Sequence, residues 1–174
     1  DTVDLLYNCV SLGLWVPFNE GWGQFSALEV ADRLRAMDPT RPIDHASGWH
    51  DQGGGDLKSR HIYYRPVRLK NDGRRVLALT EFGGYSLQCP GHLATDKKFG
   101  YRMYDDAAAW MDAVERLYET EVLPLIESQG LSAAVYTQLS DVEDEVNGFV
   151  TYDRRVEKLP EALMQAIARE LKGE

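Results

Sequence analysis

Two glutamates stand where an acid side chain could do chemistry. Glu20 follows Asn19 and the apolar run 15–18, and Glu81 follows the apolar run 77–80. An acid at the carboxyl end of a buried parallel strand lies at the sheet rim, where α/β proteins place their chemistry. Two such carboxylates suit glycoside hydrolysis, in which one protonates the leaving oxygen and the other attacks the anomeric carbon. On the residues alone, the alternative that each glutamate only caps a strand or pairs with an arginine stays open.

The elements that must position these acids alternate between apolar runs and helical patterns. Short continuous apolar runs predict buried strands, and apolar residues three and four apart predict amphipathic helices. Pro124 should kink the longest helix or begin a new turn, and Gly130 should end it. The alternation favours a parallel sheet. We expect strands over 10–18, 42–47, 61–64, 76–82, 131–138 and 149–152, and helices over 1–8, 25–37, 102–128 and 159–171.

Four segments, in order along the chain, resemble motifs of glycoside hydrolase family 2, the β-galactosidases, β-glucuronidases and β-mannosidases. Residues 15–20 resemble its strand-four motif with an Asn-Glu pair, and 38–42 the approach to strand five. Residues 80–84 resemble its strand-seven nucleophile segment, and 135–141 its strand eight. The resemblance implies an α/β fold that is a partial TIM (β/α)8 barrel, strands four to eight, with residues 1–174 as one domain. It also implies a piece of a longer multidomain enzyme, inactive or nearly so alone.

The same resemblance implies a role for five residues. Glu20 would be the general acid/base and Glu81 the nucleophile. Asn19 would hydrogen-bond the sugar 2-hydroxyl, and Tyr63 would lie against the nucleophile. Tyr136 stands where many relatives carry a tryptophan that lines the sugar site, which is a departure from the family pattern.

Four further side chains have two interpretations each. Trp49 and His50, in the loop after the 42–47 run, suit a sugar platform or an ordinary lid over the core. His61 is expected to satisfy a backbone group rather than reach a sugar hydroxyl. Trp15 is expected in the core.

The activity implied is that of a retaining O-glycosyl hydrolase acting on a terminal β-linked, β-galactoside-like sugar. The Asn-x-Lys motif that binds a sugar carboxylate in β-glucuronidases does not follow Glu81, and the net charge of −9 also disfavours an anionic sugar. The alternative is a non-catalytic carbohydrate-binding or interaction relative of the barrel. An esterase or peptidase is disfavoured because no Gly-x-Ser-x-Gly elbow occurs.

The composition argues against two classes of partner, nucleic acids and membranes. Clustered Lys and Arg, on which nucleic-acid binding rests, do not occur, and no apolar run approaches the roughly 20 residues that span a bilayer. The two cysteines are too few for a disulfide framework. We expect no cofactor and no metal site, since 45–56 fits no zinc spacing and 143–154 no calcium loop. A homo-oligomer is one assembly that we consider. The sequence does not fix the cellular compartment, and the cytoplasm is slightly favoured.

Overall fold

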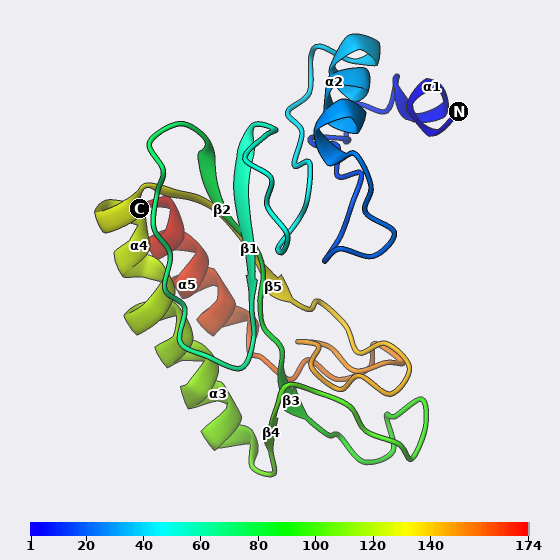
Figure 1. The fold of residues 1–174 in the computed structure, drawn as a ribbon. Helices are drawn as coiled ribbons and strands as arrows, with labels where there is room; N and C mark the ends of the chain where they lie inside the picture. The colour runs from blue at the N-terminus through cyan, green and yellow to red at the C-terminus, as the bar shows by residue number, and fades with distance from the viewer. Residues whose placement is uncertain (174) are drawn as a thin grey trace. The chain divides into compact units, whose positions relative to one another are not determined.

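The computed structural model describes residues 1–173, which form two compact units of mixed α/β structure (Figure 1). The first unit contains residues 1–61, 69–80 and 129–133. The second contains residues 62–68 and 81–128, and the chain from 134 onward.

One sheet of the structure is three-stranded and parallel. Its strands are β1 (Leu57–Ile62), β2 (Val76–Gly83) and β5 (Leu131–Thr137), in the order β1-β2-β5. Each strand begins in the first unit and ends in the second. The parallel α/β class predicted from the sequence is therefore confirmed, although β1 begins four residues earlier than the expected 61–64 strand.

The first two predicted strands are not regular strands. Residues 15–19 and 43–47 run parallel, but they are joined only by isolated bridges, Trp15 with Ile43 and Asn19 with Ser47. Pro17 lies between the bridging positions and has no amide hydrogen to donate to a ladder. Val10, at the start of the expected 10–18 strand, is 99% exposed. The direction of this pairing was predicted correctly, and its regularity was not.

The helices of the first unit cover a small core. These are α1 (Thr2–Leu6) and α2 (Ala27–Met37). The core holds Val3, Trp15, Ala31 and Ile43, which confirms Trp15 as a core residue. The indole N–H of Trp15 donates to Asp38, the buried residue that ends α2, at 2.9 Å.

The long helix predicted over 102–128 is three consecutive segments in the second unit. They are α3 (Ala107–Arg116), the π-helix η1 (Leu117–Val122) and α4 (Leu123–Gln129). Asp106 begins α3 by accepting a hydrogen bond from the Ala109 amide at 2.7 Å. Pro124 lies in the first turn of α4, as expected for a new turn. Gly130, at φ 68°, follows the last residue of α4.

The segment before α3 also differs from the expected loop and helix start. Residues 85–87 (β3, Tyr85–Leu87) and 102–104 (β4, Arg102–Tyr104) form a two-stranded parallel sheet. Trp110 of α3 donates its indole N–H to the Tyr85 carbonyl at 2.8 Å, which ties α3 to β3. These strands are only three residues long, which is too short for an alternation of apolar and polar residues to be recognised in the sequence.

Two further predicted strands differ from the structure. β5 is at the edge of the described sheet, so only its first residue, Leu131, is buried, and Val135 is 56% exposed. The expected 149–152 strand is reduced to bridges of Val150 with Ser140 and Glu157. The final helix, α5 (Glu161–Lys172), is as predicted. Among residues 1–173, no helix has the length and apolar character that crossing a membrane requires.

Candidate functional site

Glu20 lies in a tight turn of the first unit, immediately after the extended segment 15–19. Its backbone is in the left-handed region at φ 53°, which is uncommon for a residue with a side chain. The Glu20 amide donates to the Ser47 carbonyl at 3.0 Å, so the turn is anchored to the neighbouring segment 43–47. The side chain is 16% exposed. A carboxylate held in this way is oriented and still reachable by a substrate.

A buried histidine holds the Glu20 carboxylate. His61 Nδ1 lies 2.7 Å from Glu20 Oε1, and the other ring nitrogen lies 3.1 Å from the Ser47 hydroxyl. The Ser47 hydroxyl in turn lies 3.0 Å from that of Thr80, at the end of the first-unit part of β2. The four side chains form one chain of hydrogen bonds, Glu20–His61–Ser47–Thr80.

One polarity of this chain of hydrogen bonds suits Glu20 with or without its proton. His61 donates from Nδ1 to Glu20 Oε1 and accepts from the Ser47 hydroxyl through Nε2. The second carboxyl oxygen of Glu20 can then release or take up a proton while Oε1 stays bonded to the imidazole.

Glu81 is held by a different kind of partner, in the second unit. It follows Thr80 on β2 and accepts a hydrogen bond from the Tyr63 hydroxyl. The same hydroxyl lies 3.0 Å from that of Thr137, at the end of β5. Tyr63 is 8% exposed, and its ring stacks on Tyr101 with centroids 3.7 Å apart. The phenol is thus fixed in position against the Glu81 carboxylate.

Burial, and then the hydrogen bond to Glu81, raise the pKa of Tyr63 well above its ordinary value. The phenol therefore keeps its proton at any ordinary pH and acts as a donor. The phenol O–H is directed at the Glu81 carboxyl, and it is the ionised form of a carboxyl that attacks as a nucleophile.

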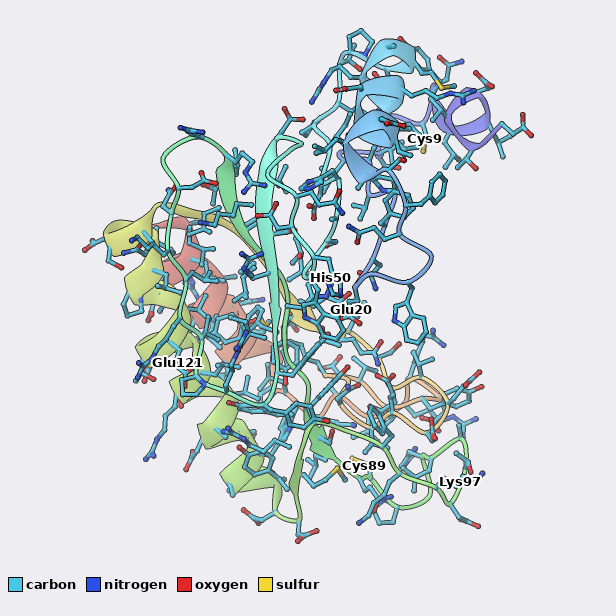
Figure 2. The ribbon with its side chains drawn as sticks, viewed as in Figure 1. Cys9, Glu20, His50, Cys89, Lys97 and Glu121 are labelled. Atoms are coloured by element: carbon cyan, nitrogen blue, oxygen red, sulfur yellow. The ribbon has the colours of Figure 1, made fainter. Side chains whose placement is uncertain are left out.

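The remaining residues expected to bind substrate fall into two groups. Asn19 ends the first extended segment of the first unit, Trp49 and His50 lie on the loop that follows the second, and all three are exposed. Figure 2 shows Glu20 and His50 close together. The predicted substrate roles of these three residues are compatible with their exposure and stay predictions.

Tyr136 lies in an aromatic cluster of the second unit. Its ring stacks on Phe149 at 4.2 Å and meets Phe82 edge-on at 5.6 Å. Its hydroxyl accepts from the Tyr85 amide at 3.2 Å, and burial raises its pKa. The structure accounts for Tyr136 as a packing residue beside β2, and its predicted sugar contact stays a prediction.

His61 belongs to the candidate site, and its bonding partners were predicted wrongly from the sequence. It was expected to satisfy a backbone group, whereas its ring bonds the Glu20 carboxylate and the Ser47 hydroxyl. The available signal was its position two residues before Tyr63, because alternate residues of a strand share a face. Ser47 was not singled out at all, since a serine ending a short apolar run carries no distinctive pattern.

The clusters considered for metal binding have protein partners. Asp51 forms two hydrogen bonds of 2.8 Å with the guanidinium of Arg75, which lowers the pKa of that carboxyl to about 2. In the acidic loop, Glu145 accepts from the side-chain amides of Gln138 and Asn147. These contacts give both carboxylates a structural role. The expected absence of a metal stays a prediction.

No family model matches the sequence, and no curated protein matches it significantly.

Proposed function

We propose that the chain carries the catalytic acids of a retaining glycoside hydrolase, with Glu20 as general acid/base and Glu81 as nucleophile. One observation supports this most directly. His61 and Tyr63, two residues apart at the carboxyl end of β1, are both buried, and each holds one of the two carboxyls. The His61 imidazole suits a carboxyl that releases and takes up a proton, as a general acid/base does. The Tyr63 phenol, which donates, suits a carboxylate that attacks as a nucleophile.

The first step joins the sugar to the enzyme. A Glu81 carboxylate oxygen attacks the anomeric carbon, and the bond from that carbon to the leaving oxygen breaks. Glu20 gives its proton to the departing oxygen. Tyr63 keeps the attacking carboxylate oriented, and His61 Nδ1 donates to Oε1 of Glu20 throughout, so that the other carboxyl oxygen of Glu20 carries the proton that is transferred.

The second step releases the sugar. Glu20, now a carboxylate, removes a proton from water, whose oxygen attacks the anomeric carbon while the ester bond to Glu81 breaks. The configuration is retained because two displacements occur. The mechanism requires the two carboxyl groups to work about 5–5.5 Å apart.

The proposed substrate is a neutral terminal sugar in β-linkage, of the β-galactoside type, and the proposed architecture is the strand-four to strand-eight part of a (β/α)8 barrel. The net charge of −9 supports a neutral sugar, because a negative field repels anionic substrates. The parallel sheet, with Glu81 near the end of its central strand, supports the architecture.

The test uses the whole gene product and a 2-deoxy-2-fluoro-β-galactosyl fluoride, which traps the covalent intermediate. We expect one label per chain, located on Glu81 by peptide mass spectrometry, and no label in Glu81→Gln. Glu119→Gln, at an exposed position on η1, is the matched control and should label normally.

Two results would refute the proposal. One is a label on another residue. The other is turnover of nitrophenyl β-galactoside that survives both Glu81→Gln and Glu20→Gln. A protein that binds galactosides but neither cleaves them nor takes the label would instead support the non-catalytic alternative.

A further inference from the structure

Two aspartates of the first unit, Asp38 and Asp44, are both fully buried, but their carboxyl groups have very different partners. Asp38 accepts hydrogen bonds from the Arg41 guanidinium at 2.6 Å and the Trp15 indole at 2.9 Å. It also accepts from the Thr40 hydroxyl at 2.6 Å and the Thr40 amide at 3.0 Å. The Thr40 hydroxyl, with the Arg41 and Trp15 donors, outweighs burial and holds the pKa of Asp38 well below its usual range. Asp38 is therefore a buried carboxylate whose charge is compensated.

Asp44 has far fewer donors. The Ser59 hydroxyl donates to Asp44 Oδ1 at 2.8 Å, whereas Oδ2 is buried and no group of residues 1–173 donates to it. Burial raises the pKa of Asp44 and outweighs the opposing effects of the Ser59 and Ser47 hydroxyls and of the two titratable neighbours, His45 and His61. A buried carboxylate without compensating donors is costly, so these surroundings favour the neutral carboxylic acid.

The Ser47 hydroxyl connects Asp44 to the candidate site. It lies near the Asp44 carboxyl, without a hydrogen bond to its Oδ2, and it bonds His61 Nε2 at 3.1 Å. Its single proton would be drawn to an ionised Asp44, because charged acceptors form the stronger hydrogen bonds. His61 Nε2 would then face the Ser47 oxygen, which favours the imidazolium. A cation beside Glu20 would hold Glu20 as a carboxylate, which cannot act as an acid.

We propose that Asp44 is a neutral carboxylic acid in the folded protein and a positioning residue for the pair Glu20–His61. Its neutrality leaves the Ser47 hydroxyl to donate to His61 Nε2, so that the imidazole stays neutral and carries its proton on Nδ1. Glu20 then has a neutral donor at Oε1, and its other carboxyl oxygen can release and take up a proton. The inference rests on the proposed function, because only a residue that exchanges protons needs this neutral partner.

Stability as a function of pH tests the charge of Asp44 in the full chain. In the unfolded chain Asp44 loses its proton near pH 3.9, with the ordinary pKa of about 3.9, whereas the folded protein retains the proton. Folding therefore takes up a proton above about pH 4, and the wild type loses stability relative to Asp44→Asn as the pH rises. Urea unfolding between about pH 4 and 7 should show the ratio of the two folding equilibrium constants moving toward the variant, by up to about tenfold per pH unit.

Asp38→Asn is the matched control for this measurement. Asp38 is as buried as Asp44 and lies in the same unit, but its donors keep it ionised. Its side chain is therefore charged in the folded and the unfolded protein above about pH 4. The Asp38→Asn variant should not gain stability relative to the wild type as the pH rises.

The protonation of His61 is a second measurement, and it stays decisive if Asp44→Asn does not fold. Imidazole ¹⁵N NMR distinguishes a protonated ring nitrogen from an unprotonated one, and the loss of signals in His61→Gln assigns them. At pH 7 we expect His61 of the wild type to carry a proton on Nδ1 and none on Nε2. Asp44→Asn, which is also uncharged, should keep this tautomer.

Two results would overturn the inference. One is a ratio of folding equilibrium constants for Asp44→Asn and the wild type that is constant, or moves toward the wild type, as the pH rises. The other is a His61 ring that at pH 7 is protonated on both nitrogens or on Nε2 alone. Failure of the proposed function is a separate result, read from labelling of Glu81 and from turnover. A neutral Asp44 beside a neutral His61 in a protein without glycosidase activity would refute the positioning role.

Discussion

Removal of the Tyr63 hydroxyl tests whether the second unit holds Glu81 as described. Tyr63→Phe keeps the ring that stacks on Tyr101 at 3.7 Å and deletes only the group that donates to Glu81 and contacts Thr137. A hydrogen bond to a charged group contributes about 1.5–3 kcal/mol. We therefore expect the free energy of unfolding to fall by about 1.5–3 kcal/mol at neutral pH.

The same bond also carries an expected effect on activity. If the hydroxyl orients the nucleophile in the transition state, the loss of about 1.5–3 kcal/mol lowers kcat/KM by about 10- to 150-fold, since 1.36 kcal/mol corresponds to tenfold. The KM for an aryl β-galactoside should change less than kcat, because the ring surface next to the sugar is retained.

Urea denaturation followed by tryptophan fluorescence measures the first quantity. A double-mutant cycle with Glu81→Ala separates the pairwise energy from the other effects of each substitution. Tyr64→Phe is the matched control, since Tyr64 is the next residue and is 69% exposed. Equal destabilisation by Tyr63→Phe and Tyr64→Phe, within about 0.5 kcal/mol, or a cycle without coupling would contradict this role of the Tyr63 hydroxyl.

Three other substitutions test the surrounding structure. Lys158→Met breaks a buried ion pair in which the ammonium makes three hydrogen bonds. The free energy of unfolding in urea should fall by about 3–5 kcal/mol. A fall of less than about 1 kcal/mol would contradict this. Asp51→Asn should flatten the acid limb of a stability-versus-pH curve. The folded pKa of Asp51, about 2, lies below its unfolded value of about 3.9, so its contribution is full above pH about 4 and is lost towards pH 2. Gly83→Ala should unfold at lower urea than Gly73→Ala. Both glycines have positive φ, but only at Gly83 would a Cβ meet the Tyr136 ring, at 2.2 Å; equal midpoints would show that the ring moves aside without cost.

The sequence predicted those parts of the fold in which a regular pattern of apolar residues extends over a long continuous segment. The run 76–82 and the pattern 159–171 became β2 and α5 because apolar period and length agree there. The π-helix η1, the three-residue strands β3 and β4, and the irregular pairing around Pro17 were not predictable, because each depends on contacts made elsewhere in the chain. The exposure of β5 was missed for a related reason: an apolar run does not reveal whether its strand has a neighbour on both sides.

For the candidate site, the sequence indicated the two acids and Tyr63, because each stands beside a recognisable apolar run. It did not indicate His61 and Ser47 as the partners of Glu20. That contact joins positions 41 residues apart through a turn at Glu20 whose left-handed backbone no residue preference predicts.

The π-helix η1 has a consequence for insertions and deletions in this chain. The Leu123 amide donates to the Tyr118 carbonyl five residues back, so the backbone there holds one residue more per turn than an α-helix does. Removal of a single residue from 117–122 would restore α-helical spacing, and about five α-helical residues turn the chain as far as six π-helical ones, so α4 would keep its rotational phase relative to α3. The residues inside the segment would be the ones displaced, among them Glu121, whose carboxylate accepts from the Val67 amide at 2.6 Å. A one-residue length variant at this point is therefore expected to change the contacts of η1 and to leave the face of α4 in place.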